Sequence, residues 1–145
     1  MSLFSVLSVS ASGMAAQRAR AELLTENLAN AETTRTSEGG PYRRKDTVFS
    51  TEPIGSSFSS LFEEASSSSL NGVKVSDVVV DTREPERRYL PGHPDADQDG
   101  YVAFPRINPA EDMVDLMGAT RSYQANVAAM SAVKDMIQRS IDLLR

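Results

Sequence analysis

Apolar residues recur with a helical period at both ends of the chain. From about Leu3 to Ala29 they fall on one stripe of a helix, and four of them are spaced by seven residues: Leu7, Met14, Ala21 and Leu28. Gly13 and the many alanines make this predicted helix slender, which favours close approach by a neighbouring element. The helix is expected to end at Asn30 and the polar run AETTRTSEGGP that follows it.

A longer helix is predicted at the C-terminal end, and three residues signal its start. Asn108 is a typical N-cap, Pro109 suits the first helical position, and Glu111 is the acid of a capping box. A heptad pattern follows, whose a-like positions are Met113, Thr120, Val127, Lys134 and Ile141. Its d-like positions are Leu116, Tyr123, Met130, Ile137 and Leu144.

The period of this second pattern has a structural consequence. A 3.5-residue repeat held along the whole helix predicts a left-handed coiled-coil partner. At about 1.5 Å per residue the helix extends roughly 50 Å. A rod of this length is too long to cover only a small globular core.

The pattern changes between the two helices. TVF at 47–49, VKVSDVVVD at 73–81 and YVAF at 101–104 are rich in β-branched and aromatic residues, and turn-forming residues bound them. These runs predict short antiparallel strands. Residues 56–69, SSFSSLFEEASSSS, have low complexity and are interpreted as a loop.

The pattern therefore predicts an α+β fold in three parts. Residues 1–36 supply the N-terminal helix, residues 37–107 a small β-rich middle region, and residues 108–145 the C-terminal helix. Each helix has an apolar seam to bury, and the simplest solution is an antiparallel, coiled-coil-like pair that packs against copies or relatives. Function would then reside in surfaces and not in an active site.

Composition narrows the possible partners. The formal net charge of −5 over 145 residues argues against nucleic acid, which selects for clustered Lys and Arg. Two basic runs, Arg43 to Lys45 and Arg87 to Arg88, lie beside tyrosines but among acidic residues. We interpret them as solvated or partner-facing strands. The chain has no Cys, which excludes disulfides, thiolate metal sites and Cys nucleophiles.

The N-terminus does not resemble a cleavable signal peptide. No Lys or Arg precedes Arg18, and serines at positions 5, 8, 10 and 12 interrupt the apolar residues. No stretch approaches the roughly 20 apolar residues that span a bilayer. Export, if it occurs, is expected to use a route that reads no signal of this kind.

Candidate catalytic groups are few. His93 is the single His, and it lies between Gly92 and Pro94 in a turn. No G-x-S-x-G nucleophile turn is present, and Gly39 and Gly40 precede Pro41 where a phosphate loop needs Lys followed by Ser or Thr. We therefore expect no enzyme, no catalytic residue, no cofactor and no small-molecule substrate.

The stretch PGHPDADQDGYVAF, residues 91–104, raises an alternative. Asp95, Asp97 and Asp99 alternate before Gly100, as in the first half of a calcium loop. The twelfth position, where a bidentate Glu would close the coordination sphere, is Arg106. An Asp-rich turn with Gly at positive φ is the other interpretation. A calcium-binding interaction module remains the alternative function, although we assign no metal ligand.

Long motifs resemble a known family. SGMAAQRARAELLTENLANAETTRT (12–36), GGPYRRK (39–45), YLPGHPDADQDGYV (89–102) and RSYQANVAAMSAVKDMI (121–137) resemble the bacterial flagellar rod and hook family, in particular a proximal rod component of the basal body. The resemblance covers nearly the whole chain apart from the Ser-rich interval. FPRIN, residues 104–108, departs from it, because related proteins more often have Tyr-Pro-Asn-Val-Asn there.

The resemblance implies a structural subunit that polymerises through its terminal helices into the drive shaft between the membrane ring and the hook. Implied partners are copies of the chain, other rod proteins, the base of the rod at the membrane ring and export gate, and the flagellar type III export apparatus. The implied location is the rod in the periplasm, reached without signal cleavage. A calcium-binding module and a secreted or enzymatic protein are the competing classes.

Residues expected at assembly interfaces come from the matching motifs and from the heptad seams. At the N-terminal end they are Ser12, Gly13, Met14, Gln17, Leu24, Asn27, Leu28, Asn30, Thr33 and Thr34. In the C-terminal helix they are Met113, Leu116, Tyr123, Asn126, Val127, Met130 and Ile137.

Overall fold

The computed structural model describes residues 3–54 and 70–143. Its elements, in chain order, are α1 (Leu3–Ala29), β1 (Lys45–Pro53), β2 (Asn71–Val80), β3 (Glu86–Tyr89), β4 (Tyr101–Phe104) and α3 (Pro109–Asp142). The predicted α+β class is therefore confirmed. The Ser-rich segment 56–69 lies outside the described residues.

The helix α3 begins where the capping signals predict. The Asn108 side chain accepts a hydrogen bond from the backbone N–H of Ala110 at 3.2 Å, and Pro109 occupies the first turn. Glu111 and Asp112 place negative charge in this turn, where the helix dipole favours it. From this start α3 runs for 34 residues.

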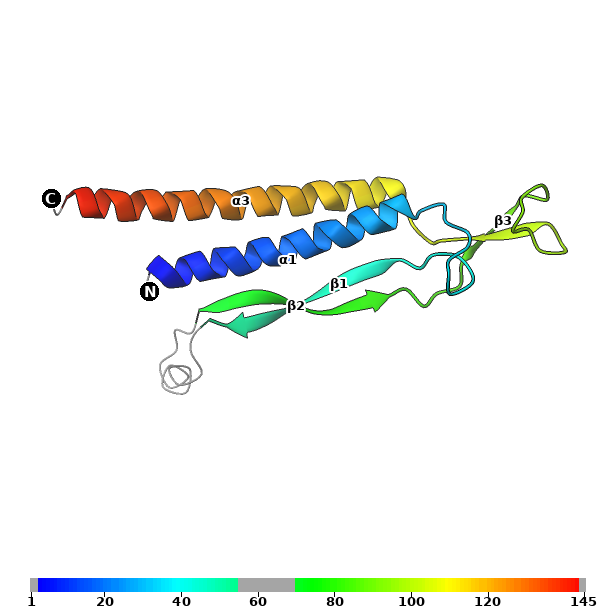
Figure 1. Cartoon of the computed structure of the whole chain (residues 1–145), viewed down its shortest axis with the longest axis horizontal. Helices are drawn as coiled ribbons and strands as arrows, with labels where there is room; N and C mark the ends of the chain where they lie inside the picture. The colour runs from blue at the N-terminus through cyan, green and yellow to red at the C-terminus, as the bar shows by residue number, and fades with distance from the viewer. Residues whose placement is uncertain (1–2, 55–69, 144–145) are drawn as a thin grey trace.

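Three layers lie along the length of an elongated molecule (Figure 1). The helix α1 is the middle layer, with α3 antiparallel to it on one side and the β1–β2 hairpin along the other. None of the helices in the described ranges is long and apolar enough to cross a membrane. The layered arrangement buries α1 from two directions and leaves the far side of α3 uncovered by described residues.

The face that α3 turns inward differs by one position from the predicted seam. Its buried residues are Asp112, Ala119 and Val133. The predicted a-like residues Met113, Val127 and Ile141 are 52%, 41% and 54% exposed. A seven-residue repeat fixes the period of a helix face but not which of two adjacent rows meets the partner. In this row Ala119 is buried, and Asn126 lies against Gly13 of α1.

The predicted d-like row lies closer to the helix interface. Leu116, Met130 and Ile137 are half-buried, whereas Tyr123 is 40% exposed. These three side chains flank the row of small and polar residues that faces α1. The apolar pattern therefore marks one border of the helix interface correctly and places its centre one residue too far along the chain.

The strands form two separate two-stranded antiparallel sheets. In the first, Lys45 pairs with Val80 and Pro53 with Asn71, with an irregularity between Val48 and Phe49. In the second, Glu86 pairs with Phe104. The predicted runs 47–49 and 101–104 lie within β1 and β4, and the run 73–81 lies in β2 except for Asp81, which follows the strand. The second basic run lies within the exposed strand β3, as the charge pattern indicated.

Candidate assembly surfaces

The exposed positions of α3 combine large apolar side chains with a long stretch that carries no charge. Between Arg121 and Lys134 the helix carries no charged residue. Large apolar side chains are exposed along its length: Met113, Val114, Met117, Tyr123, Val127, Met136, Ile141 and Leu143. The exposed positions of a surface helix in a monomer are mostly polar. The outer side of α3 is therefore suited to burial against another chain.

The helix α1 also has an outward row with a heptad spacing. Its exposed residues are Phe4, Ser8, Ala11, Ala15, Arg18, Glu22, Thr25 and Ala29. The first half of this row is small or apolar, while Arg18 and Glu22 form an exposed ion pair of 2.8 Å in the second half. Exposed pairs of this kind contribute little to stability. The N-terminal half of the row is thus the part that would gain most from burial.

Two of the predicted interface residues hold the layers of the chain together. The Ser12 hydroxyl donates to the carbonyl of Val9 at 2.7 Å and accepts from the backbone N–H of Val73 at 3.1 Å, which fixes β2 on α1. Gly13 faces Asn126 of α3, and a Cβ at Gly13 would lie 3.2 Å from the Asn126 amide. Both residues therefore serve contacts within one chain.

Asn27 is the most connected of the predicted residues. It is completely buried, its Nδ2 donates to the carbonyl of Lys45 at 2.8 Å, and its Oδ1 accepts from the Lys45 N–H at 3.0 Å. The same Oδ1 accepts from the Tyr42 hydroxyl at 3.0 Å. Burial, followed by the charge of Glu26, raises the pKa of Tyr42 to about 12. This Asn27 clamp ties the start of β1 to α1.

The residues after α1 connect it to the acidic turn. Asn30 Nδ2 donates to the Glu26 carbonyl at 2.9 Å, and Thr33 Oγ1 donates to Asn30 Oδ1 at 3.1 Å. Thr34 Oγ1 donates to Asp95 Oδ2 at 2.8 Å, across 61 positions of sequence. The TTRT motif therefore docks the β3–β4 turn onto the end of the helix.

The acidic turn itself uses its carboxylates as backbone acceptors. Asp97 Oδ1 accepts from the N–H of Asp99 at 3.0 Å and of Tyr101 at 2.8 Å. Gly100 has a φ of 82°, which favours glycine. Among the described residues no group of three or more His, Cys, Asp or Glu is arranged to hold a metal ion. Asp95 and Asp97 thus have structural partners, as the turn interpretation requires.

The remaining predicted residues divide by exposure. Met14, Gln17 and Leu28 are half-buried, and Leu24 is buried. Met113, Tyr123 and Val127 are exposed. The structure therefore brings the N-terminal set inside the chain and leaves part of the α3 set on the surface. The assignment of the whole set to interfaces between chains stays a prediction.

Sequence reasoning missed one buried ion pair. Arg44 Nη2 lies 2.9 Å from Asp112 Oδ1, and the Asp112 side chain is 1% exposed. Burial raises the pKa of Asp112 above its ordinary value, and Arg44 offsets part of that rise. The residues are 68 positions apart, so no local pattern could pair them.

Comparison with known proteins identifies the chain. Residues 98–143 match the family model described as flagellar basal body rod FlgEFG protein C-terminal. The chain is 43% identical over 150 residues to the flagellar basal-body rod protein FlgC of Bacillus subtilis (strain 168), covering 99% of both. It is 34% identical over 151 residues to FlgC of Borreliella burgdorferi, covering 100% of this chain and 99% of the relative. It is 35% identical over 144 residues to FlgC of Salmonella typhimurium, covering 99% and 98%.

Full-length similarity of this extent confirms the resemblance seen in the motifs. The chain belongs to the flagellar basal-body rod proteins, and its branch of that family is FlgC. All three relatives described above carry that name, so the resemblance to one rod component in particular is confirmed as well.

Proposed function

We propose that this chain is a structural subunit of the flagellar basal-body rod and that it polymerises through α1 and α3. The observation that carries the proposal is the set of large apolar side chains that α3 leaves exposed among the described residues. Exposed apolar side chains gathered on one element are typical of a surface that another chain covers.

The energetic reason is the hydrophobic effect. Fully burying a Met, Val or Ile side chain stabilises an assembly by roughly 1.5–3 kcal/mol. Met113, Met117 and Val127 are each exposed by two-fifths or more; Met117 lies four residues after Met113, and Val127 lies two heptads after Met113. Burying such a row offsets the entropy lost when subunits associate. The rod names of the relatives support the same conclusion.

The proposal also includes the location of the subunit in the cell. It sits in the proximal rod, spans part of the periplasm and contacts copies of itself, other rod proteins and the base of the rod. Export through the flagellar type III apparatus, without signal cleavage, delivers it there. The antiparallel helices α1 and α3 both extend along the long dimension of the molecule (Figure 1), an arrangement that suits a drive shaft.

A charge placed on the outer side of α3 tests the proposal. In cells that depend on this chain for swimming, Met113→Glu combined with Val127→Glu is expected to abolish swimming and to keep the protein out of basal bodies. Both residues are exposed, so the purified variant should retain its helical circular dichroism. Asn71→Glu, at an exposed strand end, is the matched control and should swim normally. Normal swimming by the double variant would contradict the proposal.

A further inference from the structure

One flank of the molecule carries more guanidinium groups than carboxylates. Arg43, Arg83 and Arg106 line a groove that also contains Asp81, and we call these four residues the arginine flank. Asp81 is already paired: Arg83 Nη2 lies 2.6 Å from its Oδ2. Arg83, through this hydrogen bond, and to a smaller extent Arg106 lower the pKa of Asp81 to about 2. The carboxylate is therefore ionised and engaged at neutral pH.

Arg106 acts on Asp81 only at a distance, and it forms no ion pair with a described residue. Its side chain is exposed, and no carboxylate of the described part of the chain lies within 4.0 Å of it. A neighbouring groove of about 420 Å³ is lined by Arg106, Glu86 and Glu111, among others. Glu86 pairs with Arg88 at 3.1 Å, and Glu111 belongs to the first turn of α3, where the helix dipole favours it. Arg106 is thus free to bind an anion from outside.

The opposite flank presents a rigid acidic tip, which we call the GG loop, residues 36–40. The Thr36 N–H donates to the Gly40 carbonyl at 2.8 Å and the Gly39 N–H donates to the Thr36 carbonyl at 3.1 Å, so the loop closes on itself. Gly39 and Gly40 have φ values of 89° and 77°, and these positive values allow the chain to reverse direction within the loop. Glu38 is exposed within this closed loop and forms no ion pair with any described residue.

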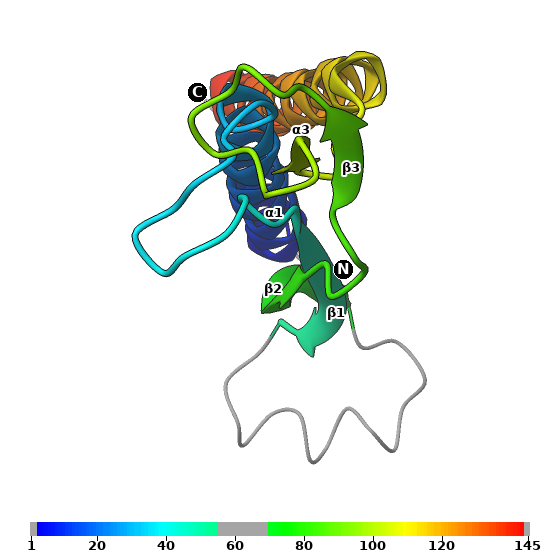
Figure 2. The ribbon, with the colours of Figure 1, turned by 90° about the vertical axis from the view of Figure 1, so that its right-hand side faces the viewer.

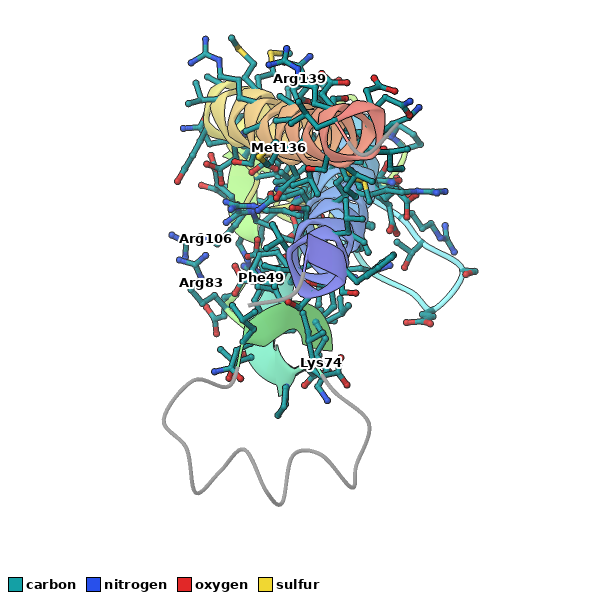
Figure 3. The ribbon with its side chains drawn as sticks, turned by 90° about the vertical axis from the view of Figure 1, so that its left-hand side faces the viewer. Phe49, Lys74, Arg83, Arg106, Met136 and Arg139 are labelled. Carbon is teal, nitrogen blue, oxygen red and sulfur yellow. The ribbon has the colours of Figure 1, made fainter. Side chains whose placement is uncertain are left out.

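The two features lie on opposite sides at the same end of the molecule. Figure 2 shows the cyan connection between α1 and β1 projecting away from the helices, on the side away from β3. In Figure 3 the labelled Arg83 and Arg106 lie on one side of the molecule and this connection lies on the other. Both the α1–β1 and the β2–β3 connections occur at the end of the molecule where α3 begins (Figure 1).

We propose that Glu38 of one copy binds Arg106 of the next copy in the rod, with Arg43 and Arg83 adding positive charge around it. The inference rests on the proposed function, since it needs copies side by side. When a second copy is placed beside the first by a sideways shift, the GG loop of one copy faces the arginine flank of the other. Two different surfaces then meet, so the contact is head-to-tail. A planar guanidinium can hold a carboxylate with two parallel hydrogen bonds, so the contact also sets the rotation between copies.

The natural absence of Cys makes a direct test possible. The double variant Glu38→Cys with Arg106→Cys, expressed in place of the wild type, is purified in basal bodies and oxidised. We expect a ladder at multiples of the mass of the chain on a non-reducing gel, which collapses on reduction. Each single variant should give no ladder. Glu38→Cys with Arg139→Cys, at the far end of α3, is the matched control and should give none either (Figure 3).

Charge reversal gives a second readout. Glu38→Arg and Arg106→Glu are each expected to reduce the swimming-ring diameter by about half or more, because like charges then oppose one another. Combining them should restore at least most of the wild-type diameter. Failure of the ladder and of the rescue, with the chain still present in basal bodies, would overturn the contact and leave the rod function intact. A cross-link to a protein of different mass would overturn the choice of a second copy. Absence of the wild-type chain from basal bodies would overturn both proposals.

Discussion

Removing the Asn27 clamp should destabilise the chain, because one side chain then ceases to hold three groups of the segment that follows α1. Asn27→Ala leaves the backbone N–H and C=O of Lys45 and the hydroxyl of Tyr42 without the partners that now lie at 2.8–3.0 Å. A hydrogen bond contributes about 1 kcal/mol net, and a buried group left unpaired costs about 1–3 kcal/mol. Because Lys45 is only partly buried, we expect a loss of about 2–4 kcal/mol in the free energy of unfolding.

The assay is urea unfolding of the purified chain, followed by circular dichroism. Domains of this size have a total stability of about 5–15 kcal/mol, so the expected loss shifts the midpoint clearly. Tyr42→Phe removes one of the three bonds and should cost about 1 kcal/mol. The double variant Asn27→Ala with Tyr42→Phe should lose less stability than the sum of the two single variants, because both changes break the same hydrogen bond. Asn71→Ala, at an exposed site, is the control. A change below about 0.5 kcal/mol for Asn27→Ala would refute the reasoning, because such values are typical of exposed positions.

Three further predictions concern the helix interface, the buried ion pair and acid stability. Gly13→Val should lower the melting temperature, because its Cβ would lie 3.2 Å from the Asn126 amide. Gly118→Ala has no neighbouring side chain within 4 Å and should raise the melting temperature through a helix propensity of about 1 kcal/mol. Equal melting temperatures of the two variants would contradict this. Arg44→Ala should lower the free energy of unfolding in urea by about 3–5 kcal/mol, because it leaves the buried Asp112 carboxylate unpaired. The control Arg87→Ala, at an exposed site, should lower it by under about 0.5 kcal/mol. Similar losses for both variants would refute the ion-pair argument. The pKa of Asp81 in the folded chain is about 2, below its ordinary 3.8. The contribution of the Asp81 carboxylate to the free energy of unfolding is therefore present above pH 3.8 and is lost as the pH falls toward 2. Asp81→Asn should flatten the pH dependence of stability in that window, and an unchanged dependence would contradict the assignment.

Local signals predicted local structure well. The start of α3 follows from Asn108 and Pro109 alone, because a cap acts on backbone groups within one turn. The strand runs follow from β-branched residues between turn formers. The two interpretations of the acidic turn share one local pattern, and the structure favours the turn through the local bonds of Asp97 and through the bond from Thr34 to Asp95, which no local pattern encodes.

Long-range pairings account for what the sequence could not show. The inward row of α3 depends on the small residues that α1 offers, and a repeat read from one helix alone contains no information about its partner. Asn27 was singled out from a motif, but its role as a clamp for Lys45 depends on where the chain returns after the GG loop. The partner of Arg44 lies on another element altogether.

Fractionation of flagellated cells tests the central claim most directly. An antibody to this chain would follow it while detergent-resistant basal bodies are pelleted. The account predicts enrichment in that pellet for the wild type and its loss when Met113→Glu and Val127→Glu are combined. A wild-type chain found only in the soluble fraction would contradict a structural role in the rod.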